Sequence, residues 1–522
     1  MPSLLHRLAR WAADLDVAAA PDELLTRVRA QHLNLAGATL AAGATSSSKA
    51  LLPAPLSRGG SPTLGTDRQL PRRDATRAHA ALAAAYDHDD LLFGAPVGVG
   101  AASVVWALPK GSTVGDALSG TLAGNELAGR LALALALSPG CRGGALGPVL
   151  ALAAATAAAR AQRLDAATTA QALALALSAA GALSPAAQRA SATGRGVAYA
   201  AQVMIGVDAV EQARAGAQGP TALLDDDAWL QGISGAPPLR EAFGGLGAVW
   251  LTDHLSLKRL PGDADTLTAV EGIAEILQRH VKAAEKRLRA DQIDHIDVRL
   301  PARSYFQQRA VAELVGLDAG LITRSIPRAA AVLAIAYELG AAQLSPEWLE
   351  ERREAIDELA RRVHLFHDWS LTTKQTVQSV VALAPLLGDH RQAKAAARRF
   401  LGGARSLPAP ASLEEWTETA RARPDHLFTA RSKNPGELSA LGAHVGAFVP
   451  VEVKLYTTRG GWWPERRATL DGDGGLGAER LYTLASQKYA AGVELRVNNA
   501  KALRGLALGE PAEALVSLLN AG

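Results

Sequence analysis

An alanine-rich stretch that ends in a cluster of carboxylates constrains the fold of this chain more than any other segment. The apolar run is followed at once by an imidazole and three carboxylates, from Asp87, His88, Asp89 and Asp90. Carboxylates at the end of a buried helix cost free energy unless they are paired or used. We therefore expect this cluster either at a functional site or in salt bridges with arginines such as Arg77.

The spacing of the carboxylates suggests how the cluster could work. Asp87 and Asp90 are three residues apart, so on a helix they share a face, and Asp89 points away. Crowded carboxylates raise the pKa of at least one member, which supplies an acid and a base within one turn. His88 adds an imidazole, a group that titrates near neutral pH when unperturbed. Asp87, His88 and Asp90 are therefore the candidate catalytic residues, and a solvated helix C-terminus is the alternative.

The same string has a metal-dependent interpretation. Asp-x-Asp-Asp in a helical protein could be the acidic motif of a terpene cyclase, or a Mg²⁺ site for a diphosphate. The sequence has no second acidic cluster of that type and no Gly-x-x-x-x-Gly-Lys-[Ser/Thr] phosphate loop. This interpretation therefore depends on four residues alone.

Composition and charge limit the classes of partner. The chain has 54 basic and 51 acidic residues and a formal net charge of +3, which gives no electrostatic case for nucleic acid or an anionic membrane. The N-terminus lacks the long apolar core of a signal peptide, and the most apolar stretch, residues 143–159, is short for a membrane span. We expect a soluble, cytoplasmic protein. Its single cysteine, Cys141, excludes an intrachain disulfide, and a buried or incidental thiol is favoured over a nucleophile.

The pattern of apolar residues changes along the chain and indicates two domains, the usual number for this length. Helical spacing and small residues dominate the first half, in which a second helix opens at Pro21. Residues 292–300, 362–366 and 450–457 alternate like strands, and the glycine-rich segment at Trp462 and Trp463 is predicted as a hairpin turn. We predict a mainly α fold. An all-α helical domain covers residues 1–265 with 475–522, and a smaller α+β lid domain covers residues 266–474.

Five short motifs in order make the chain similar to the MmgE/PrpD family. Residues 86–90 resemble the family's Asp-Phe-Asp-Asp motif, and residues 123–131 resemble its Gly-Tyr-Glu-Val-x-Gly-Arg helix. An alanine-rich helix, a Gly-Pro-Thr turn and a Lys-x-x-Pro segment follow, at residues 151–165, 219–221 and 258–261. The resemblance covers about residues 75–300 closely and the rest loosely.

The resemblance implies a fold and a chemistry. The family includes 2-methylcitrate dehydratase, cis-aconitate decarboxylase and an epimerase of iminodisuccinate. It implies a homodimer of chains with a helical domain and a lid, no metal or organic cofactor, and acid–base chemistry on a small-molecule substrate. Cationic groups hold the substrate's carboxylates in such a site. Asp87 falls on the first aspartate of the motif and Lys258 on the junction lysine, with Arg259 beside it.

Several family positions differ in this chain. The family has Thr and then His-Pro after its acidic motif, where this chain runs from Leu91 to Val97 without either. A second family histidine falls near Gly143 and Gly144, and a family lysine falls where only Arg195 is positive. No histidine lies anywhere between residues 88 and 254.

These differences favour a changed reaction. Loss of one acid–base group commonly lowers a rate by orders of magnitude. We therefore predict a diverged lyase or isomerase that catalyses dehydration, decarboxylation, epimerisation or cyclisation of a less charged metabolite. Its substrate-binding residues are the cationic Arg195, Lys258 and Arg259 and the apolar Leu91 and Val97. The alternative is a catalytically inactive homologue that serves as a binding or partner subunit.

Three other features of the sequence each have more than one interpretation. His364 and His367 have metal-like spacing only on a helix, whereas the strand pattern puts them on opposite faces. Trp462 and Trp463 could cover a ligand, but a tucked hairpin is the simpler interpretation. Lys258 and Arg259 could equally tie the two domains together.

Overall fold

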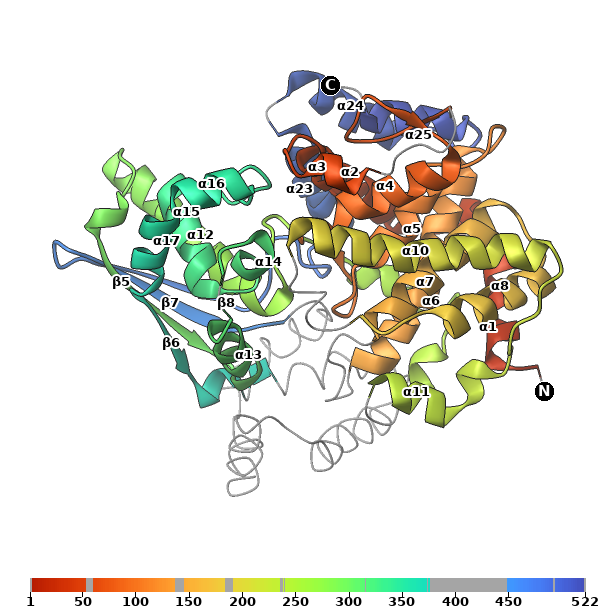
Figure 1. The fold of residues 1–522 in the computed structure, drawn as a ribbon, viewed down its shortest axis with the longest axis horizontal. Helices are drawn as coiled ribbons and strands as arrows, with labels where there is room; N and C mark the ends of the chain where they lie inside the picture. The colour runs from red at the N-terminus through yellow and green to blue at the C-terminus, as the bar shows by residue number, and fades with distance from the viewer. Residues whose placement is uncertain are drawn as a thin grey trace. The chain divides into compact units, whose positions relative to one another are not determined.

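The computed structural model describes residues 2–52, 60–136, 145–183, 191–234, 238, 240–314, 316–372, 374–375, 448–491 and 493–520. Cys141, Gly143 and Gly144 lie outside these residues. The chain divides into two compact units: unit 1 is Met1–Arg259 with Gly474–Gly522, and unit 2 is Leu260–Asp473. The fold is mainly α, as predicted, and its one larger sheet lies in unit 2 (Figure 1).

Unit 1 is built almost entirely from helices. Their bounds are α1 Leu4–Asp14, α2 Asp22–Gly43, α3 Ser48–Leu51, α4 Arg72–Ala84, α5 Val97–Val105, α6 Val114–Ala136, α7 Leu146–Ala161, α8 Ala166–Ala179, α10 Ala192–Arg214, α11 Asp227–Ser234, α23 Ala478–Ala490, α24 Glu494–Gly505 and α25 Ala512–Asn520. Short 3-10 helices cover Val17–Ala19, Leu223–Asp225, Arg240–Phe243 and Leu251–His254. Two antiparallel pairs of two-residue strands complete it: β1 Ser61–Pro62 with β2 Gln69–Leu70, and β3 Asp90–Leu91 with β4 Ser256–Leu257.

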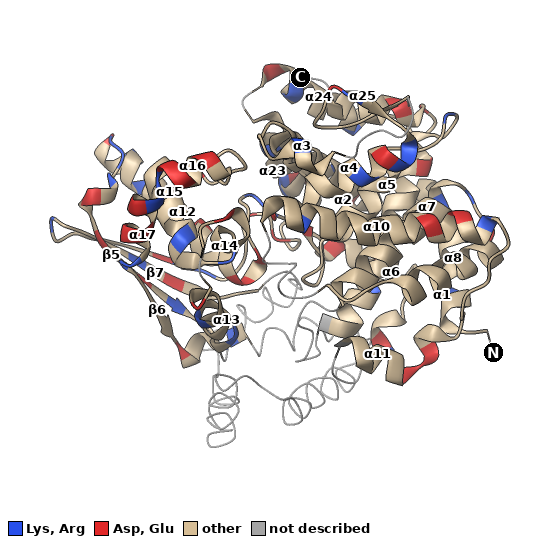
Figure 2. Ribbon diagram, viewed as in Figure 1, with Lys and Arg blue, Asp and Glu red and all other residues tan. Residues whose placement is uncertain are grey.

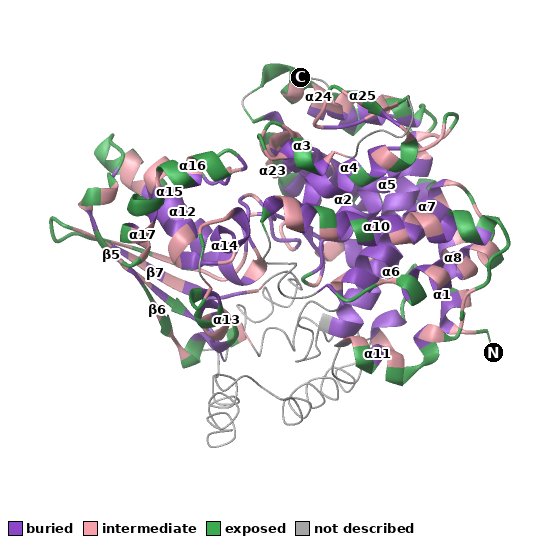
Figure 3. Cartoon of the chain, in the orientation of Figure 1, coloured by how far each residue is buried: buried purple, intermediate pink, exposed green. Residues whose placement is uncertain are grey.

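Helix α7 forms the centre of unit 1, where it packs against α5, α6, α8 and α10. It is rich in alanine and buried over nearly its whole length (Figure 3). Small residues let its neighbours approach closely: a Cβ on Gly206 of α10 would meet the carbonyl oxygen of Ala151 and lie 2.8 Å from the Cβ of Ala154. Gly and Ala therefore act as packing residues at this contact.

Polar side chains fix the ends and neighbours of α6. Thr113 and Asp116 form a capping pair, in which the Asp116 carboxylate accepts from the Thr113 N–H at 2.9 Å. Glu126 and Arg130, four residues apart on α6, form an ion pair at 3.5 Å. Glu126 accepts hydrogen bonds from the backbone of Leu251 and Thr252, so α6 anchors this segment of unit 1.

In its described residues, unit 2 is an α+β unit with one four-stranded sheet in the order β6-β5-β7-β8. Its strands are β5 Ile293–Leu300, β6 Val363–His367, β7 Val451–Thr457 and β8 Trp462–Arg467, and its helices are α12 Ala264–Ala284, α13 Ala302–Ala312, α14 Ala319–Ile322, α15 Ile326–Ala336, α16 Pro346–Glu351 and α17 Arg353–Ala360, with a 3-10 turn at Ala290–Gln292. β5 runs parallel to β6 and antiparallel to β7, and β7 pairs antiparallel with β8. Helices α12 and α15 pack on the sheet.

The position of the hairpin turn differs from the prediction. Trp462, Trp463 and Pro464 belong to strand β8, and the turn lies before them, between Thr457 and Gly461. Gly460 has φ +83°, a conformation that glycine adopts freely. Pro464 is tolerated because β8 is an edge strand of the sheet.

Charged residues of both signs occur in both units (Figure 2). Along the middle of the unit 1 helices the ribbon carries few of them, consistent with an apolar core. Among the described residues, none of the helices combines the length and the apolar character that a membrane crossing requires.

Candidate active site

The acidic string forms a turn rather than the predicted helical face. Helix α4 ends at Ala84, and Asp87 adopts φ +55°, in the left-handed region. Asp tolerates this conformation better than most residues because its side chain is short and polar. The chain then reverses into β3, where Asp90 pairs with Leu257 and Leu91 with Ser256. Asp89 therefore does not point away from its neighbours as expected.

Asp87 and Asp89 form a buried ion quartet with Lys258 and Arg195. The Lys258 Nζ donates to Asp87 Oδ1 at 2.6 Å and to Asp89 Oδ1 at 2.5 Å. The Arg195 Nη2 lies 2.7 Å from Asp87 Oδ1 and 3.4 Å from Asp89 Oδ2. All four residues are at most 3% exposed. Two carboxylates and two cations balance one another, which is the condition for burying such charges. The salt bridges expected from arginines such as Arg77 are made by Arg195 and Lys258 instead. Arg77 lies on α4 and is exposed.

Two backbone carbonyls and an aromatic ring hold the two cationic residues in place. Arg195 lies in the first turn of α10, donates from Nε to the Ala84 carbonyl at 2.9 Å and stacks 4.4 Å from the Tyr199 ring centroid. Lys258 follows β4, and its backbone N–H donates to the Asp89 carbonyl. Helix α4, helix α10 and the β3–β4 pair therefore meet at the quartet.

The quartet keeps both of its cations protonated. Burial lowers the pKa of Lys258, but the carboxylates of Asp87 and Asp89 outweigh it and raise that pKa above its usual value. The pKa of Arg195 is raised in the same way, against burial, chiefly by Asp87. Neither group can therefore accept a proton at neutral pH, and both act as fixed positive charges.

Asp90 stands apart from the quartet. Its Oδ2 accepts from Gln31 Nε2 at 2.6 Å and from the Gly98 N–H at 3.0 Å, and Gln31 also bonds to Asn125. A Cβ on Gly98 would lie 2.7 Å from Asp90 Oδ2, so only glycine permits this approach. Burial, and then the charge of Asp89, raise the pKa of Asp90 to about 7, although these hydrogen bonds oppose the rise. Asp90 is therefore poised to exchange a proton near neutral pH.

His88 is the partly exposed member of the turn. Its Nε2 lies 2.9 Å from the Arg259 carbonyl, so this nitrogen donates and Nδ1 is left as the acceptor. Burial, and next the nearby charge of Lys488, lower the pKa of His88 well below its usual value, so the ring is neutral. Lys488, on α23, donates to the carbonyls of His88 and Lys258 and to Asn34.

The structure brings together most of the residues predicted from the sequence. Asp87, Arg195 and Lys258 are in direct contact, and Arg259 meets His88 through its carbonyl oxygen. The apolar Leu91 and Val97 are buried next to Asp90 and to its partner Gly98 along the chain.

Several residues of this region were not predicted as site residues from the sequence. They are Asp89, the amides Gln31, Asn34 and Asn125, and Lys488. The amides at 31 and 34 are three residues apart, so on a helix they share a face, and that spacing was an available signal. Nothing in the sequence around residue 488 connects it with a turn 400 residues earlier.

The fold and this turn define a mainly α protein whose buried acidic turn carries groups suited to acid–base chemistry. The family model for the MmgE/PrpD N-terminal domain matches residues 6–242. This match covers just under half of the chain and supports its membership of the MmgE/PrpD family, a family of dehydratase- and lyase-type enzymes. A comparison with curated proteins finds no match to this chain.

Proposed function

We propose that this chain is an acid–base enzyme of lyase or isomerase type that acts on a small metabolite. One observation carries the proposal: two neighbouring groups of the turn have pKa values shifted in opposite directions. The pKa of Asp90 rises to about 7, while that of His88 falls well below its usual value. Groups whose environments separate their pKa values in this way are suited to acid and base roles.

Each group of the turn then has a role that follows from its protonation state. His88, kept neutral by its lowered pKa, accepts a hydrogen bond from the substrate at Nδ1, and Asp90, with a pKa of about 7, exchanges the proton with the substrate. Lys258 and Arg195 are fixed cations that stabilise negative charge as it develops. Asp87 is a positioning residue in this scheme, since its carboxylate contacts both cations.

The charge balance favours a substrate with few charges. Asp87 and Asp89 already neutralise Lys258 and Arg195, so little positive charge is left for a tricarboxylate. Leu91 and Val97 add apolar surface next to the turn. A monocarboxylate with an apolar body fits these conditions better than a citrate-like acid. A homodimer and a cytoplasmic location stay predictions.

The quartet also weakens the magnesium interpretation of the motif. A Mg²⁺ site for a diphosphate needs carboxylates that face the ion. Here Asp87 and Asp89 each contact an ammonium and a guanidinium group, which would repel a divalent cation.

The proposal is tested by solvent exchange. The purified chain is incubated in D₂O with a panel of mono-, di- and tricarboxylic acids, and loss of C–H signals is followed by proton NMR. We expect exchange with at least one acid, and a fall of about 100-fold or more in Asp90→Asn and His88→Gln. Asp14→Asn, at an exposed carboxylate, is the control and should keep the rate. Equal rates in all four proteins would contradict the proposal.

A catalytically inactive partner subunit is the second candidate. It is favoured by the complete pairing of the quartet and by the absence of any histidine between residues 88 and 254. Co-expression with a family member that keeps these histidines tests it. A stable mixed oligomer on size-exclusion chromatography would support this candidate, and separate elution of the two proteins would reject it.

A further inference from the structure

One face of the unit 2 sheet gathers two histidines and an aspartate. His295 and Asp297 are two residues apart on β5, so they share a face, and His364 on β6 is the direct partner of Asp297 across the parallel pair. Helix α12 lies against the other face, where a Cβ on Gly272 would contact Val453. All three residues are partly or fully exposed.

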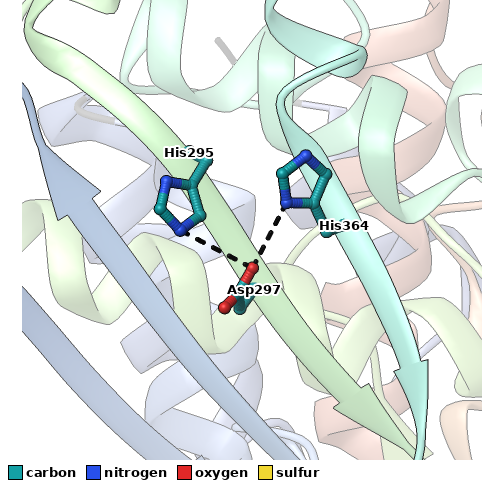
Figure 4. Close-up of side chains that lie close together, drawn as sticks. All are labelled: His295, Asp297 and His364. Atoms are coloured by element: carbon teal, nitrogen blue, oxygen red, sulfur yellow. Dashed lines mark ion pairs between the residues drawn. The ribbon is translucent and has the colours of Figure 1, made fainter.

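The ligand atoms of these residues lie close together (Figure 4). His364 Nδ1 is 3.4 Å and His295 Nε2 is 3.8 Å from the same oxygen, Asp297 Oδ1. All three atoms lie within 4.8 Å of one another. Ligands bonded at about 2.1 Å to a tetrahedral zinc ion are about 3.4 Å apart. One of the two measured distances already matches this spacing, and a small rotation of His295 would bring the other to it.

A second observation concerns the orientation and the tautomer of the His295 ring. Its Nδ1 lies 2.8 Å from the Asp294 carboxylate, so Nδ1 carries the proton and Nε2 offers its lone pair toward Asp297. A carboxylate on the far nitrogen is the usual support of a metal-binding histidine. The pairing of β5 with β7 shifts register between residues 293 and 295, beside Asp294, and the His295 ring stacks 4.2 Å from Tyr456.

We propose that His295, Asp297 and His364 bind a divalent transition-metal cation, with zinc as the best fit. Two imidazoles and one carboxylate suit zinc and its neighbours in the first transition row, whereas Mg²⁺ and Ca²⁺ prefer oxygen ligands throughout. Three protein ligands leave at least one position to water or to an external ligand. The bound ion would also join β5 to β6 at the surface of the sheet.

The histidine pair considered from the sequence is not the site. His367 lies on the opposite side of β6 from His364 and contacts Thr372. The second histidine and the carboxylate come instead from β5, about 70 residues earlier in the sequence. Local residue spacing cannot reveal such a pairing between distant strands. Lys454 is the partner of Asp297 on β7, and its ammonium lies over the Trp462 ring at 5.4 Å.

Zinc titration tests the proposal. The full chain, without an affinity tag and treated with chelator, is titrated with Zn²⁺ by calorimetry. We expect one ion per chain, a loss of affinity of about 100-fold or more in His364→Ala and Asp297→Asn, and a loss of about tenfold in Asp294→Asn. His367→Ala, on the same strand, is the matched control and should bind as the wild type does. Absence of saturable binding, or equal affinity in His364→Ala, would overturn the proposal.

Two further readouts guard against variants that fail to fold. Zn²⁺ should raise the melting temperature of the wild type and of His367→Ala, but not that of Asp297→Asn, because only a competent site stabilises the folded state. Co²⁺ bound to the wild type should give the intense visible bands of tetrahedral coordination. Bands of an octahedral ion would contradict the assigned geometry even where no variant can be purified.

Discussion

At the scale of single residues, a turn of four positions holds carboxylates with different surroundings. Asp87 and Asp89 form ion pairs with cations, whereas Asp90 accepts hydrogen bonds from an amide and a backbone N–H. The same side chain is therefore a fixed charge at two positions and a titratable group at the third. This separation depends on the left-handed backbone at Asp87, which ends the helical arrangement.

The raised pKa of Asp90 predicts an effect on stability. Between about pH 4 and pH 7 the folded chain holds a proton on Asp90 that the unfolded chain has lost, so this contribution to stability falls as the pH rises. Asp90→Asn removes the titration. The unfolding free energy of the wild type minus that of the variant should fall by about 2–4 kcal/mol from pH 4 to pH 8. Urea unfolding across this range measures it, and parallel curves would contradict it.

Removal of one cation from the quartet should be costly. Lys258→Met leaves Asp87 and Asp89 buried with Arg195 alone, and we expect a loss of about 3–5 kcal/mol in unfolding free energy. The control is Lys49→Met at an exposed lysine, which should change stability by less than about 0.5 kcal/mol. Similar losses in both variants would show that the quartet is not a coupled unit.

The sequence predicted many of the residues of this site, but not how they are arranged in space. The family motifs pointed to Asp87, Arg195 and Lys258, which meet in the structure. The helical assumption misassigned Asp89, because one residue with positive φ changes the direction of every later side chain. Residue types indicate that Asp tolerates such a conformation, not that it adopts it.

At the scale of elements, periodic segments were predicted well and their connections less well. Long helices such as α2 and α6 and the three strands β5, β6 and β7 have repeating apolar patterns. The hairpin turn before β8 was predicted at Trp462 and Trp463, too far along the chain, because the two glycines beside them are typical of a turn. In the structure Trp463 and Pro464 belong to the edge strand β8, because their pairing with β7 determines the local conformation.

Close helix packing in unit 1 leads to a prediction with a matched control. A Cβ on Gly206 would meet the backbone of α7, so Gly206→Ala should destabilise the protein by about 1–3 kcal/mol. Gly232, on α11, has open space around it, and Gly232→Ala should stabilise by about 0.4–1 kcal/mol. Chemical unfolding compares the two. Equal effects would mean that helix propensity, not packing, controls both sites.

At the scale of the whole molecule, the change in sequence pattern predicts two kinds of architecture, and the structure has both: a helical unit 1 and an α+β unit 2. The ion quartet, His88 and Asp90 all belong to unit 1, and the three metal-ligand candidates all belong to unit 2. The two proposals therefore stand on separate observations, and each can fail without the other.

The role of Asp90 as a proton donor can be measured through the pH dependence of solvent exchange. With Asp90 as the proton donor, the exchange rate of the wild type should fall as the pH rises through about 7, while His88 stays neutral throughout. In Asp90→Asn this inflection should disappear and the rate should drop by about 100-fold. A wild-type profile that is flat between pH 6 and pH 8, or the same inflection in the variant, would contradict the role assigned to Asp90.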